Sequence, residues 1–240
     1  MNEFYWDNED NFLFVARGLF KPEDITDLNR YIKKSLSEYE PKNERDRELL
    51  DYGVAPDEIR LNEKIFDVWK RADLSILPKE LEAYKYIIYP PMIRNVKKGF
   101  DFVPWHQDVS YIRNIKHKKH NNAIICFTPL DENPSEKSTL EFCFKKGEVE
   151  LEPVFRKEHK VNVFDLKDED IPKESECISF ELNRGDVLMF GMLTLHRTFI
   201  KDETMLDRLS TEFRITREDN ILKDRDYFNI ESSQMTKGSN

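Results

Sequence analysis

Apolar residues recur at helical spacing in the first third of the chain. After Pro22, which suits the first turn of a helix, they fall every three or four positions: Ile25, Leu28, Ile32 and Leu36. Three further helical segments follow: 41–51, 56–72 and a short one from Pro78. We therefore expect residues 1–80 to form a mostly helical support.

From about Tyr84 the pattern changes to short runs that alternate between apolar and polar residues or are continuously apolar. Such runs, rich in β-branched and aromatic residues and separated by turn signals, predict strands. The expected strands are 84–91, 100–105, 123–130, 138–144, 177–182, 187–190, 193–199 and 206–217. Many short strands in one region are typical of a sandwich or barrel.

The rest of the chain divides around this β region. We expect one domain over residues 1–240, with the β core at 81–217 and a C-terminal tail at 218–240 that is loose after about Tyr227. The charged stretch 150–176 is expected to be an irregular loop over one mouth of the barrel.

Composition narrows the class of protein. The net charge of −9 argues against broad binding to nucleic acid or to anionic membranes. No apolar run is long enough for a membrane helix. The three cysteines are odd in number and widely spaced, so a disulfide framework or a cysteine-rich zinc site is not expected. We expect a reduced cytoplasmic protein whose cysteines are buried small hydrophobes.

His106 and Asp108 form a candidate metal-binding pair. In an extended segment, residues two apart point the same way, so both can ligate one ion. With five histidines and 47 acidic residues, about one such pair is expected by chance, and the pair is weak by itself. About ninety residues later, the turn at Gly185 feeds an apolar strand and a hairpin that leads to His196. A second histidine there completes a two-histidine, one-carboxylate set, which leaves positions on the metal open.

A long alternating strand follows His196. Arg208, Ser210, Glu212 and Arg214 share one face of it, and apolar residues share the other. The polar face either meets solvent or lines a barrel interior in which an arginine fork binds a dicarboxylate. Arg208 and Arg214 are both candidates for that fork.

These features together resemble the phytanoyl-CoA dioxygenase family of Fe(II)- and 2-oxoglutarate-dependent oxygenases. The resemblance covers residues 80–216 and rests on a short set of segments: His106-Gln107-Asp108, Thr128–Asp131, Ser138–Phe142, His196, Thr198 and Arg208. It implies a double-stranded β-helix, a jelly-roll or cupin-like barrel with helices packed on one sheet. The family often has Gly-Ser after the second histidine, where this chain has Arg197-Thr198.

The resemblance also implies the cofactors and the roles of the residues. His106, Asp108 and His196 would bind Fe(II), while Arg208 and the Thr198 hydroxyl would bind the far carboxylate of 2-oxoglutarate. O2 would be the second cosubstrate, and succinate and CO2 would be released. Related halogenases lack the carboxylate ligand, so Asp108 favours hydroxylation or another oxidation.

We therefore expect a dioxygenase that acts on a small molecule. The alternative is a non-catalytic jelly-roll module that binds a metal or ligand. The same residues also suit manganese or cobalt. The basic stretch from Arg113 to His120 is expected to be a solvated loop, or to meet an anionic group of the substrate through Arg113, Lys116 and Lys118. The oligomeric state is undetermined.

Other candidates carry weaker expectations. Three residues that precede the metal pair can line the pocket: Tyr86, Tyr89 and Arg94. Trp6 and Trp69 are expected to be packing residues. Trp105 either fills the core, which we favour, or forms a wall of the metal site. His117, His120 and His159 are expected to be solvated, since the lysines between His117 and His120 would repel a cation.

Overall fold

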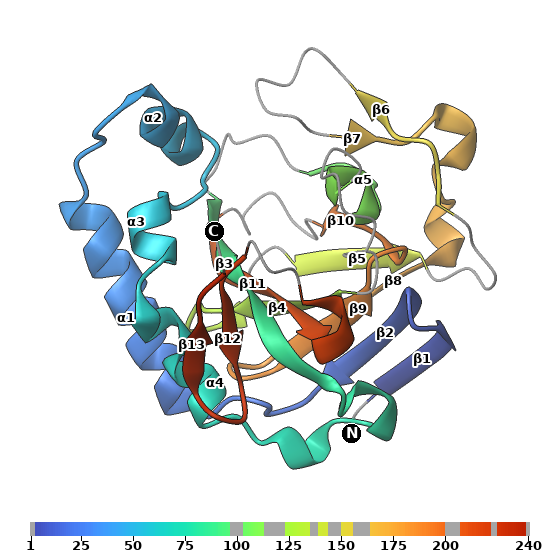
Figure 1. The fold of residues 1–240 in the computed structure, drawn as a ribbon. Coiled ribbons are helices and arrows are strands. Elements are labelled where there is room, and N and C mark those ends of the chain that lie inside the picture. The colour runs from blue at the N-terminus through green and yellow to red at the C-terminus, as the bar shows by residue number, and fades with distance from the viewer. Residues whose placement is uncertain are drawn as a thin grey trace.

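Two antiparallel sheets face each other in the computed structural model, which describes residues 3–96, 103–112, 123–134, 139–143, 150–155, 164–199, 207–221 and 225–238 (Figure 1). The large sheet has the strand order β1-β2-β9-β4-β11-β3-β12-β13 and the small sheet has the order β10-β5-β8. The strands of the large sheet are β1 Glu3–Asn8, β2 Asn11–Ala16, β3 Tyr84–Val96, β4 Ile124–Pro129, β9 Val187–Gly191, β11 Arg208–Arg217, β12 Tyr227–Asn229 and β13 Gln234–Thr236. Those of the small sheet are β5 Thr139–Cys143, β8 Cys177–Ser179 and β10 Leu195–Phe199, and β6 Val154–Phe155 pairs separately with β7 Phe164–Asp165.

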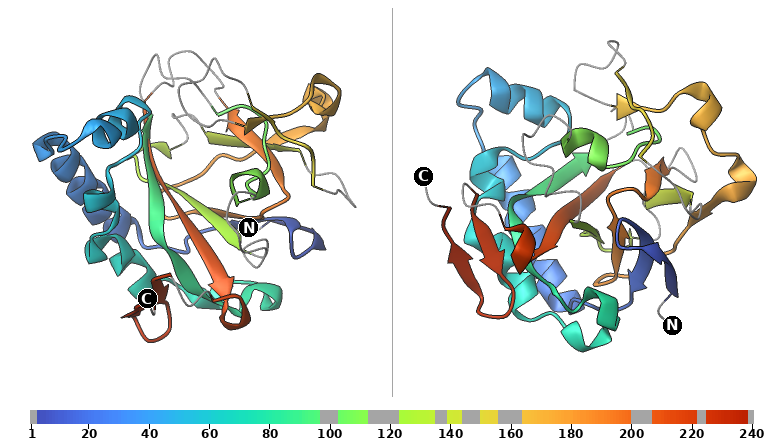
Figure 2. Two further views of the ribbon diagram at one scale, coloured as in Figure 1. Left: turned by 45° about the horizontal axis from the view of Figure 1, so that its top comes forward. Right: turned by 45° about the vertical axis from the view of Figure 1, so that its right-hand side comes forward.

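The helices of the N-terminal region pack on the outer face of the large sheet (Figure 2). They are α1 Pro22–Glu38, α2 Glu44–Asp51, α3 Asp57–Arg60 and α4 Asp67–Lys70, with α5 Val109–Ile112 elsewhere in the fold. Short 3-10 turns are η1 Glu63–Phe66, η2 Leu74–Ile76, η3 Lys79–Leu81, η6 Asp168–Asp170, η7 Glu174–Glu176 and η8 Glu218–Asn220. The expected helix after Pro22 is thus confirmed, and the expected helix at 56–72 divides into α3, η1 and α4.

Strand β11 separates two apolar cores. On its outer face, Phe213 packs with Trp69 of α4 and with α1 residues such as Ile25. Between the sheets, Phe127 and Phe190 of the large sheet pack in one cluster with Phe142 of the small sheet. Because strand residues alternate, the polar residues of β11 face this second layer and not solvent. The mainly β, jelly-roll-like fold with helices on one sheet is therefore confirmed.

Both ends of the described chain differ from the expectation. The run Asn11–Ala16 forms β2, which is buried along its whole length and pairs with β1 and β9. A continuously apolar run has no period, so its pattern did not distinguish it from the helices that follow. The expected loose tail is wrong, because β12 pairs with β3 and Tyr227 and Phe228 are buried. The stretch 150–176 is also less irregular than expected, since its described residues include β6, β7, η6 and η7.

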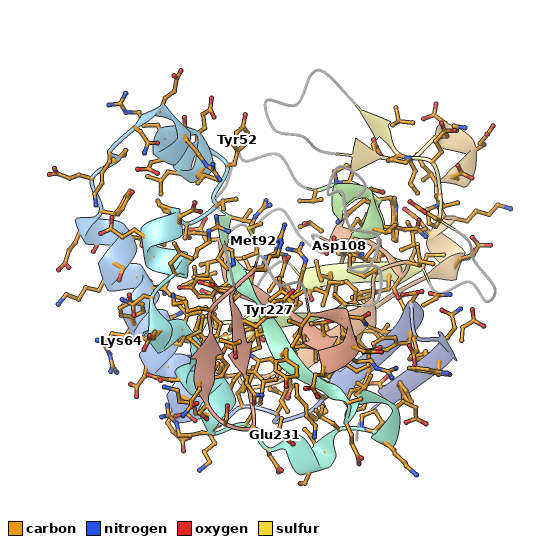
Figure 3. The ribbon with its side chains drawn as sticks, viewed as in Figure 1. Tyr52, Lys64, Met92, Asp108, Tyr227 and Glu231 are labelled. Atoms are coloured by element: carbon orange, nitrogen blue, oxygen red, sulfur yellow. The ribbon has the colours of Figure 1, made fainter. Side chains whose placement is uncertain are left out.

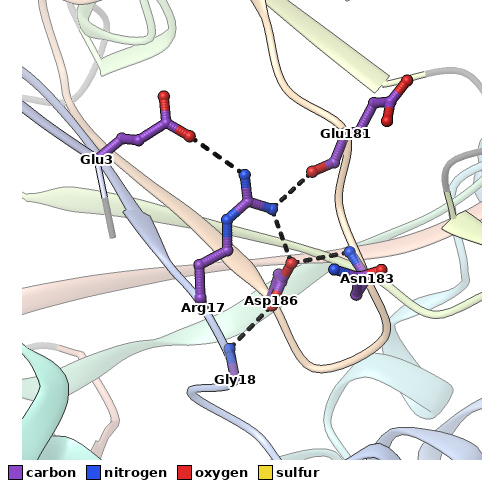
Figure 4. Close-up of polar contacts among 6 residues, drawn as sticks. All are labelled: Glu3, Arg17, Gly18, Glu181, Asn183 and Asp186. Carbon is purple, nitrogen blue, oxygen red and sulfur yellow. Dashed lines mark hydrogen bonds and ion pairs between the residues drawn. The ribbon is translucent and has the colours of Figure 1, made fainter. Parts of the chain in front are cut away.

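A buried carboxylate holds the turn that leads into β9. Asp186 accepts hydrogen bonds from Arg17 Nη1 at 2.9 Å, from the Gly18 backbone at 2.9 Å and from the Asn183 backbone at 2.8 Å (Figure 4). Gly185 has a φ of +97°, and a Cβ there would lie 2.1 Å from the Phe20 carbonyl oxygen. Glycine is therefore required beside Asp186, and the two residues fix the hairpin that carries His196.

Replacing Asp186 with alanine should destabilise the fold by about 1–3 kcal/mol, because it removes the shared acceptor of two backbone donors and of the half-buried Arg17 guanidinium. Urea unfolding measures the change. Asp219→Ala is the matched control, since the Asp219 side chain is 70% exposed and should change stability by less than about 0.5 kcal/mol. A loss at Asp186 no larger than that of the control would contradict the assignment.

Candidate active site

The two histidines are held together by the backbone. His106 donates its amide to the His196 carbonyl at 2.9 Å, and His196 donates to the His106 carbonyl at 3.1 Å. This isolated bridge joins the segment before α5 to β10. The chain then turns at Asp108, so the expectation of a continuous extended segment is only partly right. The described part of the expected strand 100–105 is irregular, and residues 100–102 lie outside the described ranges.

Asp108 nevertheless meets both imidazoles. Its Oδ1 lies 3.4 Å from His106 Nε2 and 3.8 Å from His196 Nε2, and one ligand atom from each residue lies within 4.8 Å of the others. All three residues are buried, and Asp108 lies beside α5 (Figure 3). The structure therefore brings together the three residues that the sequence predicted as metal ligands.

Backbone carbonyls set the orientation of both imidazoles. His106 Nδ1 lies 2.8 Å from the Pro104 oxygen, and His196 Nδ1 lies 2.9 Å from the Thr194 oxygen. A carbonyl only accepts, so each Nδ1 donates and each Nε2 faces the Asp108 carboxylate. Burial, followed by the charge of His106, lowers the pKa of His196 to about 3, so this imidazole is neutral. A neutral nitrogen and a carboxylate pointed at one position are suited to a divalent cation between them.

Arg214 contacts the Asp108 carboxylate on the side away from the two imidazoles. Its Nη2 donates to Asp108 Oδ2 at 3.2 Å, which leaves Oδ1 toward the imidazoles. Burial alone would raise the pKa of Asp108, but the charge of Arg214 and the hydrogen bond with His106 outweigh it and lower the pKa below its usual range. Asp108 is therefore ionised at neutral pH. This contact also separates the two arginines that the sequence left as alternatives, because it places Arg214 at the metal ligands.

Acidifying the metal-free protein should destabilise it through His196. The folded pKa of about 3 lies below the unfolded value of about 6.5, so the unfolded state binds the proton first and stability falls as the pH drops through that window. At pH 5 the loss is about 2 kcal/mol relative to pH 7. Urea unfolding in EDTA at both pH values measures it. His196→Asn lacks the titrating group and should lose correspondingly less, and equal losses in the two proteins would contradict the prediction.

A second polar cluster lies on the inner face of β11. Ser210 is fully buried and sits directly opposite Arg94 of β3. The Arg208 side chain lies beside them, buried, with its Nη1 donating to the Thr139 carbonyl at 3.2 Å. Three buried atoms there have no hydrogen-bond partner: Arg94 Nε, Arg208 Nε and Ser210 Oγ.

Buried donors without a protein partner are suited to receive an anion, because leaving them unsatisfied costs about 1–3 kcal/mol each. Burial and then the nearby charge of Arg94 lower the pKa of Arg208 to about 10, and a carboxylate at this position would offset both effects. Thr198 lies on the same strand face as His196, opposite Leu140 and next to the Thr139 carbonyl that Arg208 contacts. The cluster fits the far carboxylate of 2-oxoglutarate.

The other sequence candidates are distributed differently. Tyr86 packs at the edge of the inner cluster, whereas the ring of Tyr89 stacks on Phe66 and faces the helices. Trp105 packs outside the small sheet with Arg197 over its ring at 4.8 Å, as a packing residue. Trp69 is likewise buried in the outer core. The basic stretch with Arg113, Lys116, His117, Lys118 and His120 lies outside the described residues, as does His159.

Gln107 is a site residue that the sequence reasoning missed. It is fully buried between the two ligands and donates through Nε2 to the Leu193 carbonyl at 2.8 Å. Its Oε1 accepts from the Leu151 backbone at 2.8 Å. Gln107 thus ties the ligand segment to the hairpin before His196 and to the stretch after residue 150. Its place between two ligands was the available signal, but an extended segment would have pointed it away from the site.

Comparison with known proteins agrees with this geometry. The model of the phytanoyl-CoA dioxygenase family matches residues 15–200. Several solved structures share the fold. The non-heme monooxygenase ThoJ, in its apo form, is 11% identical and gives a TM-score of 0.59 over 87% of this chain and 75% of that chain. The epimerase SnoN in complex with Fe3+, alpha ketoglutarate and nogalamycin RO gives 0.58 at 11% identity over 88% and 81%. The carbocyclase SnoK from nogalamycin biosynthesis gives 0.57 at 11% identity over 86% and 80%.

Two further findings complete the comparison. No curated protein sequence gives a significant match to the chain. Among the described residues, no helix is both long enough and apolar enough to cross a membrane.

Proposed function

The chain belongs to the phytanoyl-CoA dioxygenase family and is a non-haem iron and 2-oxoglutarate-dependent oxygenase, and from this premise we propose that it hydroxylates a small molecule with release of succinate and CO2. The observation that carries the proposal is the buried His106, Asp108 and His196 set beside an arginine cluster whose donors lack partners. A module that only binds a ligand has no use for both features together.

The three ligand residues would hold iron from one side. His106 and His196 offer Nε2, and Asp108 offers Oδ1 while Arg214 holds its other oxygen. Ligands gathered on one face leave the opposite face for a cosubstrate and O2. Bound iron with 2-oxoglutarate supplies the oxidising power, and the protein contributes orientation and electrostatics.

Arg208 would anchor the far carboxylate of 2-oxoglutarate, with Ser210 and Thr198 as hydroxyl donors. Arg208 and Ser210 are buried and carry unpartnered donors, and Arg94 stands opposite Ser210 with its Nε also unpartnered. A guanidinium gives the strongest hydrogen bonds to a carboxylate when water is excluded. Ser210 is an addition to the pair expected from the sequence.

Asp108 favours hydroxylation over halogenation, because its carboxylate occupies the position that a halide would need. The shared fold also includes proteins described as an epimerase and a carbocyclase, so the outcome has to be measured. Mass spectrometry of substrate-screen products should show the gain of one oxygen atom. Loss of two hydrogens, or an isomer of unchanged mass, would instead show a different oxidation or an epimerisation.

We also propose that the substrate carries an anionic group. The basic stretch from Arg113 to His120 follows α5 directly and so begins five residues after Asp108 in the chain. A change of Lys116 and Lys118 to glutamate should raise the Michaelis constant of a charged substrate and leave that of 2-oxoglutarate unchanged. An unchanged substrate constant would reject this proposal.

The central test of the oxygenase assignment uses the full chain. Anaerobic addition of Fe(II) and 2-oxoglutarate should produce a weak metal-to-ligand absorption band, and air should then yield succinate. If the band forms but none of the screened substrates gives succinate, the protein binds iron and 2-oxoglutarate without turnover. Absence of both would reject iron and 2-oxoglutarate as the cofactors.

A further inference from the structure

Two of the three cysteines form a cross-strand pair on the small sheet. Cys143 at the end of β5 is the direct partner of Cys177 at the start of β8. Both belong to the small apolar cluster on the outer side of this sheet, with Trp105, Leu166 and Leu195. The widely spaced cysteines of the sequence thus become neighbours through strand pairing. Cys126 is fully buried in the outer core of the large sheet, away from this cluster.

The backbone geometry of such a pair suits a disulfide. Directly opposite residues in an antiparallel ladder have Cα atoms about 4.5 or 5.5 Å apart, and their side chains leave the same face. Disulfides need Cα separations of about 4.4–6.8 Å. Cys143 and Cys177 therefore need only side-chain rotation and a small approach of the two strands. Both are reduced in this structure, and the Cys177 thiol donates to the Lys173 carbonyl at 3.2 Å.

We propose that Cys143 and Cys177 are a redox modification site that closes to an intramolecular disulfide in the presence of a peroxide. The Cys177 thiolate attacks one peroxide oxygen, the O–O bond breaks, and one water leaves with the protons taken up. The resulting sulfenic acid is attacked by the sulfur of Cys143, and its oxygen leaves as a second water. Two thiols are oxidised by two electrons in total, and one hydrogen peroxide is reduced to two waters.

The order of attack follows from exposure. Cys177 is half-buried, whereas Cys143 is 1% exposed, so the peroxide meets Cys177 first. Burial, followed by the charge of Glu141, raises the pKa of Cys177. Only thiolate reacts, so the reaction should be slow at neutral pH and faster in mild alkali. At neutral pH the pair should therefore oxidise only when peroxide is present for a long time.

The disulfide would constrain a stretch of chain that contacts Gln107, the residue between two of the metal ligands. It closes the chain between Cys143 and Cys177, and this stretch includes Leu151, whose amide donates to Gln107. The two cysteines also pack against Trp105 and Leu195, which are adjacent in sequence to His106 and His196. The bond would restrict the unfolded chain and join β8 covalently to the strand that pairs with β10.

The test treats the full chain in EDTA with hydrogen peroxide at pH 8.5, then denatures it and alkylates the remaining thiols. Intact mass should show three alkylated thiols before oxidation and one after it. Peptide mapping without reductant should show Cys143 linked to Cys177, two hydrogens lighter than the separate peptides, and reversal by dithiothreitol. The melting temperature of the oxidised protein should rise by about 5 °C or more.

The matched variants make the result decisive. Cys126→Ser should still lose both remaining thiols on oxidation, whereas Cys177→Ser, at a half-buried position, should form no internal link and show no rise in melting temperature. Retention of both thiols in oxidised Cys126→Ser, or a link that includes Cys126 or a second chain, would overturn the proposal. Because the readouts are mass and melting temperature, they do not depend on turnover.

Discussion

Replacing Asp108 with alanine should lower the affinity for divalent metal by about a hundredfold or more and reduce succinate formation by about a thousandfold. Asp108 is the only carboxylate among the three ligand residues and is held ionised by Arg214 and His106. Its loss leaves two imidazoles and a guanidinium beside the metal position. That guanidinium then repels a cation that the carboxylate formerly attracted. Titration with Co(II), together with the Fe(II) and 2-oxoglutarate absorption band, measures the loss.

Two further variants separate metal binding from folding. Asp108→Asn keeps the shape of the side chain and removes its charge, so it should retain the folded structure while binding metal poorly. Asp219→Ala, at an exposed position of η8 just after β11, should bind metal as the unchanged protein does. Circular dichroism checks the fold of each. Normal Co(II) affinity in a folded Asp108→Asn protein would show that the carboxylate is not a ligand.

Replacing Arg208 with methionine should raise the 2-oxoglutarate concentration needed for half-maximal turnover by roughly 30- to 1000-fold, equivalent to about 2–4 kcal/mol. Arg208 is buried and its Nε has no partner, so the carboxylate that it would bind is shielded from water. Methionine fills similar space without a donor, and Ser210 and Thr198 cannot replace the charge. Because the metal ligands are untouched, Co(II) affinity should stay close to that of the unchanged protein.

The same experiment on Arg214 distinguishes the two arginines. Arg214→Met should weaken metal binding, because it removes the 3.2 Å contact with Asp108, and should change 2-oxoglutarate binding mainly through the metal. Arg217→Met, at the half-buried end of the same strand, is the matched control and should change neither. If Arg214→Met raised the 2-oxoglutarate requirement at saturating metal while Arg208→Met did not, the assignment of the two residues would be reversed.

Local pattern was sufficient for the elements whose period was clear. The alternation along β11 placed Leu209 and Phe213 on one face and Arg208 and Ser210 on the other, and the structure confirms that division. It did not decide whether the polar face met solvent or a barrel interior. That depended on the helices that cover the apolar face, which is a tertiary arrangement.

Residues whose role depends on distant partners were beyond the sequence. Gln107 matters because Leu193 and Leu151 reach it from separate parts of the chain. Arg214 and Asp108 lie more than a hundred positions apart, so their contact had no local signal. The N-terminal strand β2 was missed for a related reason, because its apolar residues become a strand pattern only when β1 and β9 lie on either side.

The ends of the large sheet carry a consequence for the behaviour of the protein in solution. Hairpins from the two ends of the described chain form its outermost strands, β1-β2 on one side and β12-β13 on the other (Figure 1). They cover β9 and β3, whose backbone groups would otherwise be open to another molecule. A variant that lacks either hairpin would expose the edge of β9 or β3. We expect such a variant to aggregate by strand pairing between molecules before it loses metal binding or activity. Insolubility of the shortened variants would therefore show that these hairpins protect the sheet edges from pairing with other molecules.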